Sequence, residues 1–225
     1  MFDIHDPTPL EILRKTDHTC LKQDAVWEDI KALCDDAMHM NVASVCIPPS
    51  YVKKAYFYLT GRMKICTVIG FPNGYSTTNA KVYEAAEALR DGADEIDMVI
   101  NIGWAKAGRF DKIGEEISAI RSVCKDRVLK VIVETCLLNE EEKIALCETV
   151  AASGADFIKT STGFSTGGAT VEDIRLFRAH LPAKVKIKAA GGIRSLEEAN
   201  DLLKAGASRI GSSRLVDEVK KLTLR

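Results

Sequence analysis

Short apolar runs alternate along the chain with longer segments whose apolar residues recur at helical spacing. In residues 196–205, for example, Leu196, Ala199, Leu202 and Leu203 would share one face of a helix. Short apolar runs that alternate with helices are typical of a parallel sheet covered by helices. We predict strands at 43–47, 64–69, 95–100, 129–134, 156–160, 185–189 and 209–211, and a weaker eighth strand around 15–19.

Local signals mark where the helices begin and end. Ser195 followed by Glu198 forms a capping box, and Asn139 followed by Glu142 forms a weaker one. Three predicted helices are followed by a Gly-Ala pair, and glycine readily takes the left-handed conformation that stops a helix. These glycines are Gly92, Gly154 and Gly206. The predicted helices include 80–91, 113–124, 140–153, 171–179 and 196–205.

The repeated strand-to-helix unit predicts the fold class. Eight such units in 225 residues favour an α/β fold, a closed (β/α)8 TIM barrel formed as a single domain over residues 1–225. An open doubly wound sheet is the structural alternative. No G-x-G-x-x-G motif opens a helix after the first predicted strand, which argues against a dinucleotide-binding version of that alternative.

Composition and charge exclude several classes of partner. Hydrophobic residues make up 46% and charged residues 28% of the chain, and the formal net charge is -1, so no basic excess would attract nucleic acid. No stretch approaches the roughly 20 apolar residues of a membrane span, and residues 1–10 have no apolar signal core. Seven cysteines without a C-x-x-C pair fit reduced thiols in a cytoplasmic protein. The four histidines also lack ligand spacing, so we expect neither a metal nor a cofactor.

The unusual residue in the apolar runs is Lys159, near the end of the predicted strand 156–160. Barrel enzymes place their sites at the carboxyl ends of the strands. Because strand side chains alternate, either Ile158 or Lys159 faces the barrel interior. An inward lysine is costly unless it is paired or has a function, although a lysine at a strand end can also extend into solvent.

Lys188 occupies the same place on the next predicted strand. Neighbouring strands lie about 4.8 Å apart, so two inward lysines would approach closely. Their mutual repulsion and their burial would lower the pKa of a lysine such as Lys159, and a neutral amine can attack a carbonyl to form a Schiff base. The alternation of Lys184, Lys186 and Lys188 is also compatible with one solvated strand face.

Further polar residues stand at the same height on other predicted strands. Asp97 could exchange protons with Lys188 through a water, or form a salt bridge with one of the lysines. Asp17 could hold Lys188 in place, cap a helix or lie in a surface turn. After the last two strands come small residues of the kind that bind phosphate through backbone N–H groups and hydroxyls. These residues are Gly191, Gly192, Ser212 and Ser213.

Six motifs in family order resemble those of the deoxyribose-phosphate aldolase family, and they span nearly the whole chain. They are L-x-x-x-D-H-T at 13–19, V-C-I-P-P at 45–49, I-G-F-P-x-G at 69–74, G-A-D-E-I-D at 92–97, K-T-S-T-G at 159–163 and K-A-A-G-G-I-R at 188–194. The resemblance implies a metal-free class I aldolase that reversibly cleaves 2-deoxy-D-ribose 5-phosphate to D-glyceraldehyde 3-phosphate and acetaldehyde in deoxyribose catabolism. It also implies a homodimer.

The resemblance also implies roles for individual residues. Lys159 would form the Schiff base, Lys188 would perturb its pKa and exchange protons, and Asp97 would be a second proton donor and acceptor. Substrate and phosphate would bind Thr162, Gly163, Gly191, Gly192, Ser212 and Ser213, and Asp17, Thr19 and Cys46 would line the site.

Two features of the chain depart from the family pattern. Phe164 stands where some relatives have a lysine near the phosphate, which predicts a weakly cationic phosphate site unless Arg194 or Arg214 supplies the charge. The segment 215–225 contains no tyrosine that could assist proton transfer. The alternatives are another class I sugar-phosphate aldolase, a non-catalytic sugar-phosphate-binding barrel and a phosphate-binding isomerase.

Overall fold

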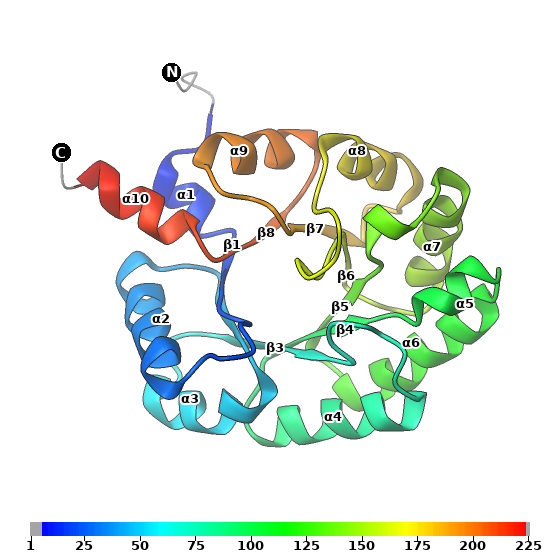
Figure 1. Cartoon of the computed structure of the whole chain (residues 1–225), viewed down its shortest axis with the longest axis horizontal. Coiled ribbons are helices and arrows are strands. Elements are labelled where there is room, and N and C mark those ends of the chain that lie inside the picture. The colour runs from blue at the N-terminus through cyan, green and yellow to red at the C-terminus, as the bar shows by residue number, and fades with distance from the viewer. Residues whose placement is uncertain (1–5, 224–225) are drawn as a thin grey trace.

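A closed barrel of eight parallel strands forms the centre of the molecule in the computed structural model, which describes residues 6–223 (Figure 1). The strands follow chain order around the barrel, and β8 pairs with β1 to close it. The predicted (β/α)8 barrel is therefore confirmed. The strands are β1 (Thr16–Thr19), β2 (Ser44–Ile47), β3 (Ile65–Ile69), β4 (Glu95–Val99), β5 (Val128–Ile132), β6 (Phe157–Lys159), β7 (Lys186–Ala190) and β8 (Arg209–Ser212).

Helices surround the barrel on its outside (Figure 1). The predicted elements agree closely with the observed ones, and the largest difference is at the helix that begins at Phe110 rather than at residue 113. The helices are α1 (Pro9–Leu13), α2 (Trp27–Met40), α3 (Val52–Leu59), α4 (Thr78–Arg90), α5 (Ile102–Lys106), α6 (Phe110–Cys124), α7 (Glu140–Ala152), α8 (Val171–His180), α9 (Leu196–Ala205) and α10 (Leu215–Thr223), with 3-10 turns η1 (Pro49–Tyr51) and η2 (Thr135–Leu137).

The helix boundaries have the predicted causes. Ser195 and Asn139 each form a full capping box with the glutamate three residues later. The glycines after α4, α7 and α9 all have positive φ, namely 109° at Gly92, 76° at Gly154 and 121° at Gly206. Each chain reversal therefore uses a backbone conformation that other residues seldom adopt.

Strand alternation separates an apolar core from a polar barrel interior. Ile96, Ile158 and Ile187 point outward and belong to the apolar cluster between strands and helices. The residues next to them in sequence therefore point inward. Lys159, not Ile158, faces the interior, and it is the register partner of Lys188. Among residues 6–223 no helix is both long and apolar enough to cross a bilayer.

Candidate active site

Lys159, Lys188 and Asp97 meet in the barrel interior. The Nζ atoms of Lys159 and Lys188 each lie 2.7 Å from the same Oδ2 atom of Asp97. All three side chains are almost completely buried. Asp97 therefore forms a salt bridge with both lysines rather than with one, and it holds two amines from adjacent strands around a single oxygen.

Asp17 lies in the same cluster rather than at a helix cap or in a surface turn. Its Oδ2 atom lies 2.5 Å from Lys188 Nζ, so Lys188 is held between two carboxylates. Burial opposes the charge of Lys188, but Asp17 and Asp97 outweigh it and raise the lysine's pKa above its usual value. Burial likewise opposes ionisation of Asp97, but the three lysines around it hold its pKa well below the usual range. The two carboxylates therefore favour the charged form of Lys188.

Three further charged residues, which the sequence patterns did not single out, belong to this cluster. Lys130 Nζ lies 2.8 Å from Asp97 Oδ1 and 2.6 Å from Glu95 Oε2. Arg209 contacts Glu95 at 3.4 Å and Asp17 at 2.5 Å. Lys130 carried the same signal as Lys159, a lysine within an apolar run, and could have been found by it. The cluster has one more cation than carboxylates: Lys130, Lys159, Lys188 and Arg209 face Asp17, Glu95 and Asp97.

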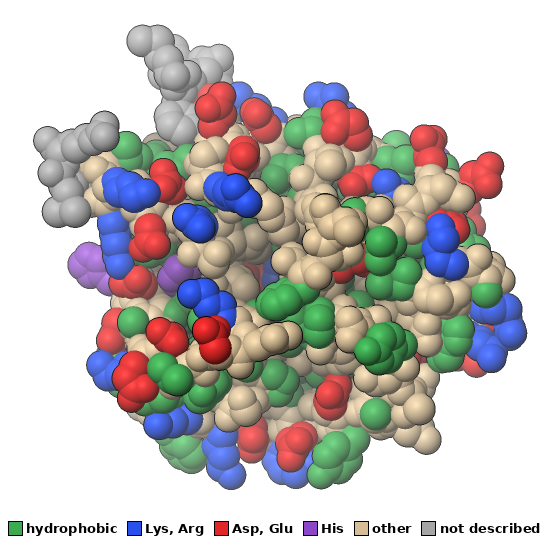
Figure 2. All heavy atoms as spheres, in the orientation of Figure 1, with side chains coloured by type: hydrophobic (Ala, Val, Ile, Leu, Met, Phe, Trp, Pro, Cys, Tyr) green, Lys and Arg blue, Asp and Glu red, His purple; other side chains and the backbone are tan. Residues whose placement is uncertain are grey.

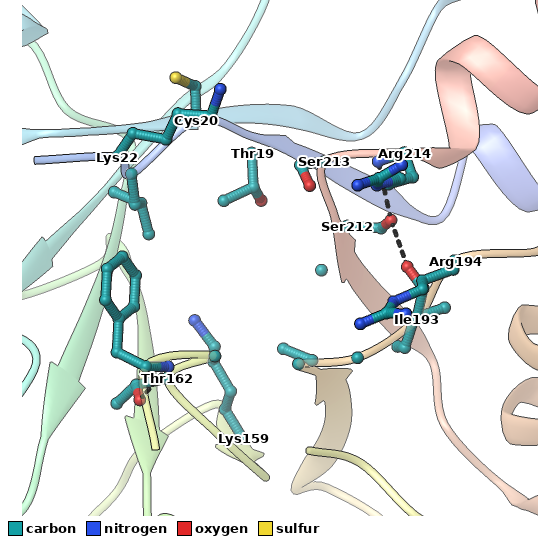
Figure 3. A pocket seen from close by; sticks show the side chains of 17 residues that line it. Thr19, Cys20, Lys22, Lys159, Thr162, Ile193, Arg194, Ser212, Ser213 and Arg214 are labelled. Atoms are coloured by element: carbon teal, nitrogen blue, oxygen red, sulfur yellow. Dashed lines mark hydrogen bonds between the residues drawn. The ribbon is translucent and has the colours of Figure 1, made fainter. Parts of the chain in front are cut away.

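A pocket of about 340 Å³ opens above this cluster, at the carboxyl ends of β1, β6, β7 and β8. Figure 3 shows the amine of Lys159 pointing into it, while Arg194 reaches in from the opposite wall. Four of the predicted site residues do not line the pocket, namely Asp17, Cys46, Asp97 and Lys188. Those that line it are Thr19, Lys159, Thr162, Gly163, Gly191, Gly192, Ser212 and Ser213.

Three cationic side chains also line the pocket: Lys22, Arg194 and Arg214. Figure 2 shows Lys and Arg side chains beside the central hollow of this face, on the side of α9 and α10. The ring of Phe164 stands at the rim and packs edge-on against Phe71, with 5.2 Å between ring centroids. Residues other than position 164 therefore bring positive charge to the pocket, which is the alternative that the sequence left open for Arg194 and Arg214.

Two predicted hydroxyls have partners within the protein. The Ser212 hydroxyl donates to the Ile193 carbonyl at 2.9 Å and accepts from the Arg214 N–H at 3.1 Å, so it joins the loops after β7 and β8 (Figure 3). The Thr162 hydroxyl donates to Glu134. Gly191 has a φ of 86°, and a Cβ atom there would lie 3.1 Å from the Gly168 Cα atom. The turn after β7 therefore needs glycine.

Cys46 lies deeper in the barrel, in a small apolar cluster with Cys66 and Val68. The barrel also brings the thiols of Cys46 and Cys66 and a carboxylate oxygen of Asp97 within 4.8 Å of one another. Two thiols and a carboxylate are possible ligands for a divalent metal. Both oxygens of Asp97 already contact ammonium groups, however, and these would repel a cation placed there.

The molecule is a (β/α)8 barrel whose pocket contains the Lys159 amine, held by the buried carboxylate of Asp97. This is the arrangement of a lysine-dependent barrel enzyme. The model of the DeoC/LacD family of aldolases matches residues 12–213. The chain belongs to this family of aldolases.

Curated relatives and solved structures agree with this assignment. The deoxyribose-phosphate aldolase of Clostridioides difficile is 58% identical over 93% of this chain and 95% of its own length. That of Streptococcus pyogenes serotype M4 is also 58% identical, over 93% of this chain and 94% of its own. A tetrameric deoxyribose phosphate aldolase from Aeropyrum pernix superposes with a TM-score of 0.89 at 30% identity, covering 96% of this chain and 92% of its own.

Proposed function

We propose that this chain catalyses the reversible cleavage of 2-deoxy-D-ribose 5-phosphate to D-glyceraldehyde 3-phosphate and acetaldehyde through a Schiff base on Lys159. The observation that carries the proposal is the arrangement of one pocket, which has the Lys159 amine at its floor and three cationic side chains on its wall. Curated relatives 58% identical to the chain are named deoxyribose-phosphate aldolases. The substrate matches both features, because it carries an aldehyde at one end and a phosphate at the other.

Lys159 is the amine that the cluster holds least firmly. It contacts one carboxylate, whereas Lys188 contacts Asp17 and Asp97, and Lys130 contacts those two and Glu95. Since the cluster has an excess of positive charge, releasing one proton relieves repulsion. Lys159 gives this proton to water in the pocket, because its neighbours keep more carboxylate contacts. The neutral amine then attacks C1 of the open-chain sugar.

The remaining steps use the charged pair beneath Lys159. Addition to C1 gives a carbinolamine, which loses water to form an iminium ion. The C3 hydroxyl then gives up its proton while the C2–C3 bond breaks, and glyceraldehyde 3-phosphate leaves. The electron pair of the broken C2–C3 bond forms the C1=C2 double bond of an enamine on Lys159. Protonation at C2 and hydrolysis release acetaldehyde and free Lys159. Asp97 and Lys188, which share a 2.7 Å contact, exchange these protons through a water.

The phosphate binds at the other end of the pocket. Arg194, Arg214 and Lys22 attract it, and the backbone of Gly191 and Gly192 and the Ser213 hydroxyl orient it. Because these residues follow β7, β8 and β1 whereas Lys159 ends β6, phosphate binding fixes which end of the sugar meets the amine. We also propose a cytoplasmic location and a homodimer, which the reduced cysteines and the family resemblance support.

Borohydride trapping tests the function directly. Only a Schiff base is reduced to a permanent adduct, so acetaldehyde and borohydride should add one two-carbon group, and mass spectrometry should place it on Lys159. Lys159→Leu should lose both the label and the cleavage of deoxyribose 5-phosphate while keeping the fold. Labelling of the Lys159→Leu variant would mean that the nucleophile is elsewhere, and an unlabelled native protein would favour a non-catalytic binding barrel.

A further inference from the structure

The residue Glu134, at the carboxyl end of β5, has an unusual backbone and environment. It has a φ of 59° and a ψ of 66°, the left-handed region, although it is not glycine. Its side chain is buried, with 2% of its surface exposed. Disfavoured backbone conformations persist where surrounding contacts enforce them, often beside a functional site. The mechanism above makes no use of this carboxylate.

The hydrogen bonds of Glu134 all lead to one loop or its own turn. The Thr162 N–H donates to both carboxylate oxygens at 3.3 Å, and the Thr162 hydroxyl donates to Oε2. The Cys136 thiol lies 3.9 Å from Oε1. Within residues 6–223, the hydrogen-bond partners of the Glu134 carboxylate are thus uncharged donors. A buried carboxylate without a cation is unfavourable, so these donors stabilise it only while the loop stays in place.

The contact passes from Thr162 to the wall of the pocket. The Thr162 hydroxyl also accepts from the N–H of Phe164 at 3.1 Å, and Gly163 between them has a φ of 84°. Thr162, Gly163 and Phe164 all line the pocket beside Lys159. Glu134 therefore restrains three consecutive residues of the wall through one side chain.

The opposite side of the loop is held separately. The Ala169 N–H donates to the carbonyls of Ala190 and Gly191 at 3.1 Å each. The Thr160 hydroxyl donates to the Ala190 carbonyl at 3.0 Å, next to Lys159. Removing the Glu134 contact would therefore release the wall at residues 162–164 and leave Lys159 in its strand.

We infer that Glu134 is a positioning residue that fixes residues 162–164 as the substrate-binding wall of the pocket, without taking part in the chemistry at Lys159. The inference rests on the proposed function, because it assumes that the sugar phosphate occupies this pocket. A glutamine at position 134 keeps the size of the side chain, but its NH2 group must face either the Thr162 N–H or the Thr162 hydroxyl and cannot accept from it, so at least one contact is lost in either orientation of the amide.

The test compares Glu134→Gln with Glu141→Gln, which changes an exposed glutamate at the start of α7. Glu134→Gln should raise KM for deoxyribose 5-phosphate about tenfold or more, because the wall shifts, and change kcat much less. Borohydride trapping of Lys159 by acetaldehyde should keep its native rate, and Glu141→Gln should match the native protein in every assay. An unchanged KM in folded Glu134→Gln overturns the inference, and so does loss of trapping, which would place Glu134 in the chemistry.

Two further measurements keep the result decisive. If Glu134→Gln does not fold, Thr162→Val breaks the hydroxyl contact from the other side and should show the same rise in KM; an unchanged KM refutes the inference. If the native protein does not cleave deoxyribose 5-phosphate, the proposed function fails, and amide hydrogen exchange of residues 160–168 tests Glu134 independently. Faster exchange at Thr162 and Phe164 in Glu134→Gln supports the restraint, and unchanged exchange contradicts it.

Discussion

Replacing Lys130 by methionine removes the central cation of the barrel interior. Lys130 is fully buried and contacts Glu95 at 2.6 Å, Asp97 at 2.8 Å and Asp17 at 3.6 Å. Burial opposes the charge of Lys130, but these carboxylates outweigh it and raise the pKa of the lysine well above its usual value. Methionine fills a similar volume, so the change is mainly the loss of charge.

The expected loss of unfolding free energy depends on which cations still contact each carboxylate. Breaking a buried ion pair by removing one partner typically costs about 3–5 kcal/mol. Arg209 still contacts Glu95, and Lys159 and Lys188 still contact Asp97, so neither carboxylate loses every cation. We therefore expect the lower end of this range, about 3 kcal/mol, which is a large share of the 5–15 kcal/mol typical of folded domains.

The pH dependence has a definite sign. Lys130 helps to hold the pKa of Asp97 below its usual value, against the effect of burial. The stability that this carboxylate contributes is therefore present above its unfolded pKa of about 3.9 and is lost as the pH falls below it. The difference between Lys130→Met and the native protein should be full at pH 7 and should shrink below about pH 4.

Urea unfolding followed by circular dichroism measures this difference. Lys184→Met, which changes an exposed lysine before β7, is the matched control and should cost less than about 0.5 kcal/mol. Lys130→Met combined with Glu95→Gln removes one charge of each sign and should recover at least about 1 kcal/mol. A loss below about 1 kcal/mol for Lys130→Met at pH 7, or a loss that is no smaller at about pH 3 than at pH 7, would refute the electrostatic reasoning.

Three other predictions follow from the site. Lys188→Leu should slow imine formation with acetaldehyde at pH 7, because Asp97 then contacts one ammonium group fewer and stabilises the charged form of Lys159 more strongly; an unchanged rate in borohydride trapping would contradict this. Arg214→Met should raise KM for deoxyribose 5-phosphate several-fold at low salt, less at high salt, and leave free deoxyribose unaffected. Burial lowers the pKa of His18, so the native protein should lose stability as the pH falls below about 6.5. The loss should be at most about 1.4 kcal/mol per pH unit, and His18→Gln should reduce this slope in urea unfolding.

Short-range patterns in the sequence were sufficient to predict the fold and several residues of the site. Alternation within strands placed Lys159 and Lys188 as candidates for the interior, because side-chain direction in a strand follows from local geometry. The capping boxes at Ser195 and Asn139 and the glycine at position 92 marked helix ends for the same reason. The number of strand-to-helix units then favoured a closed barrel.

The composition of the charged cluster depended on the tertiary structure. Asp17 and Arg209 are far apart in the chain, and they meet because β8 pairs with β1 at the closure of the barrel. Cations from residues 22, 194 and 214 reach one pocket, so Phe164 alone was a poor guide to its charge. The contact of Glu134 with Thr162 likewise joins loops of neighbouring strands. Strand register and barrel closure bring such residues together, and these are properties of the whole sheet that no short segment determines.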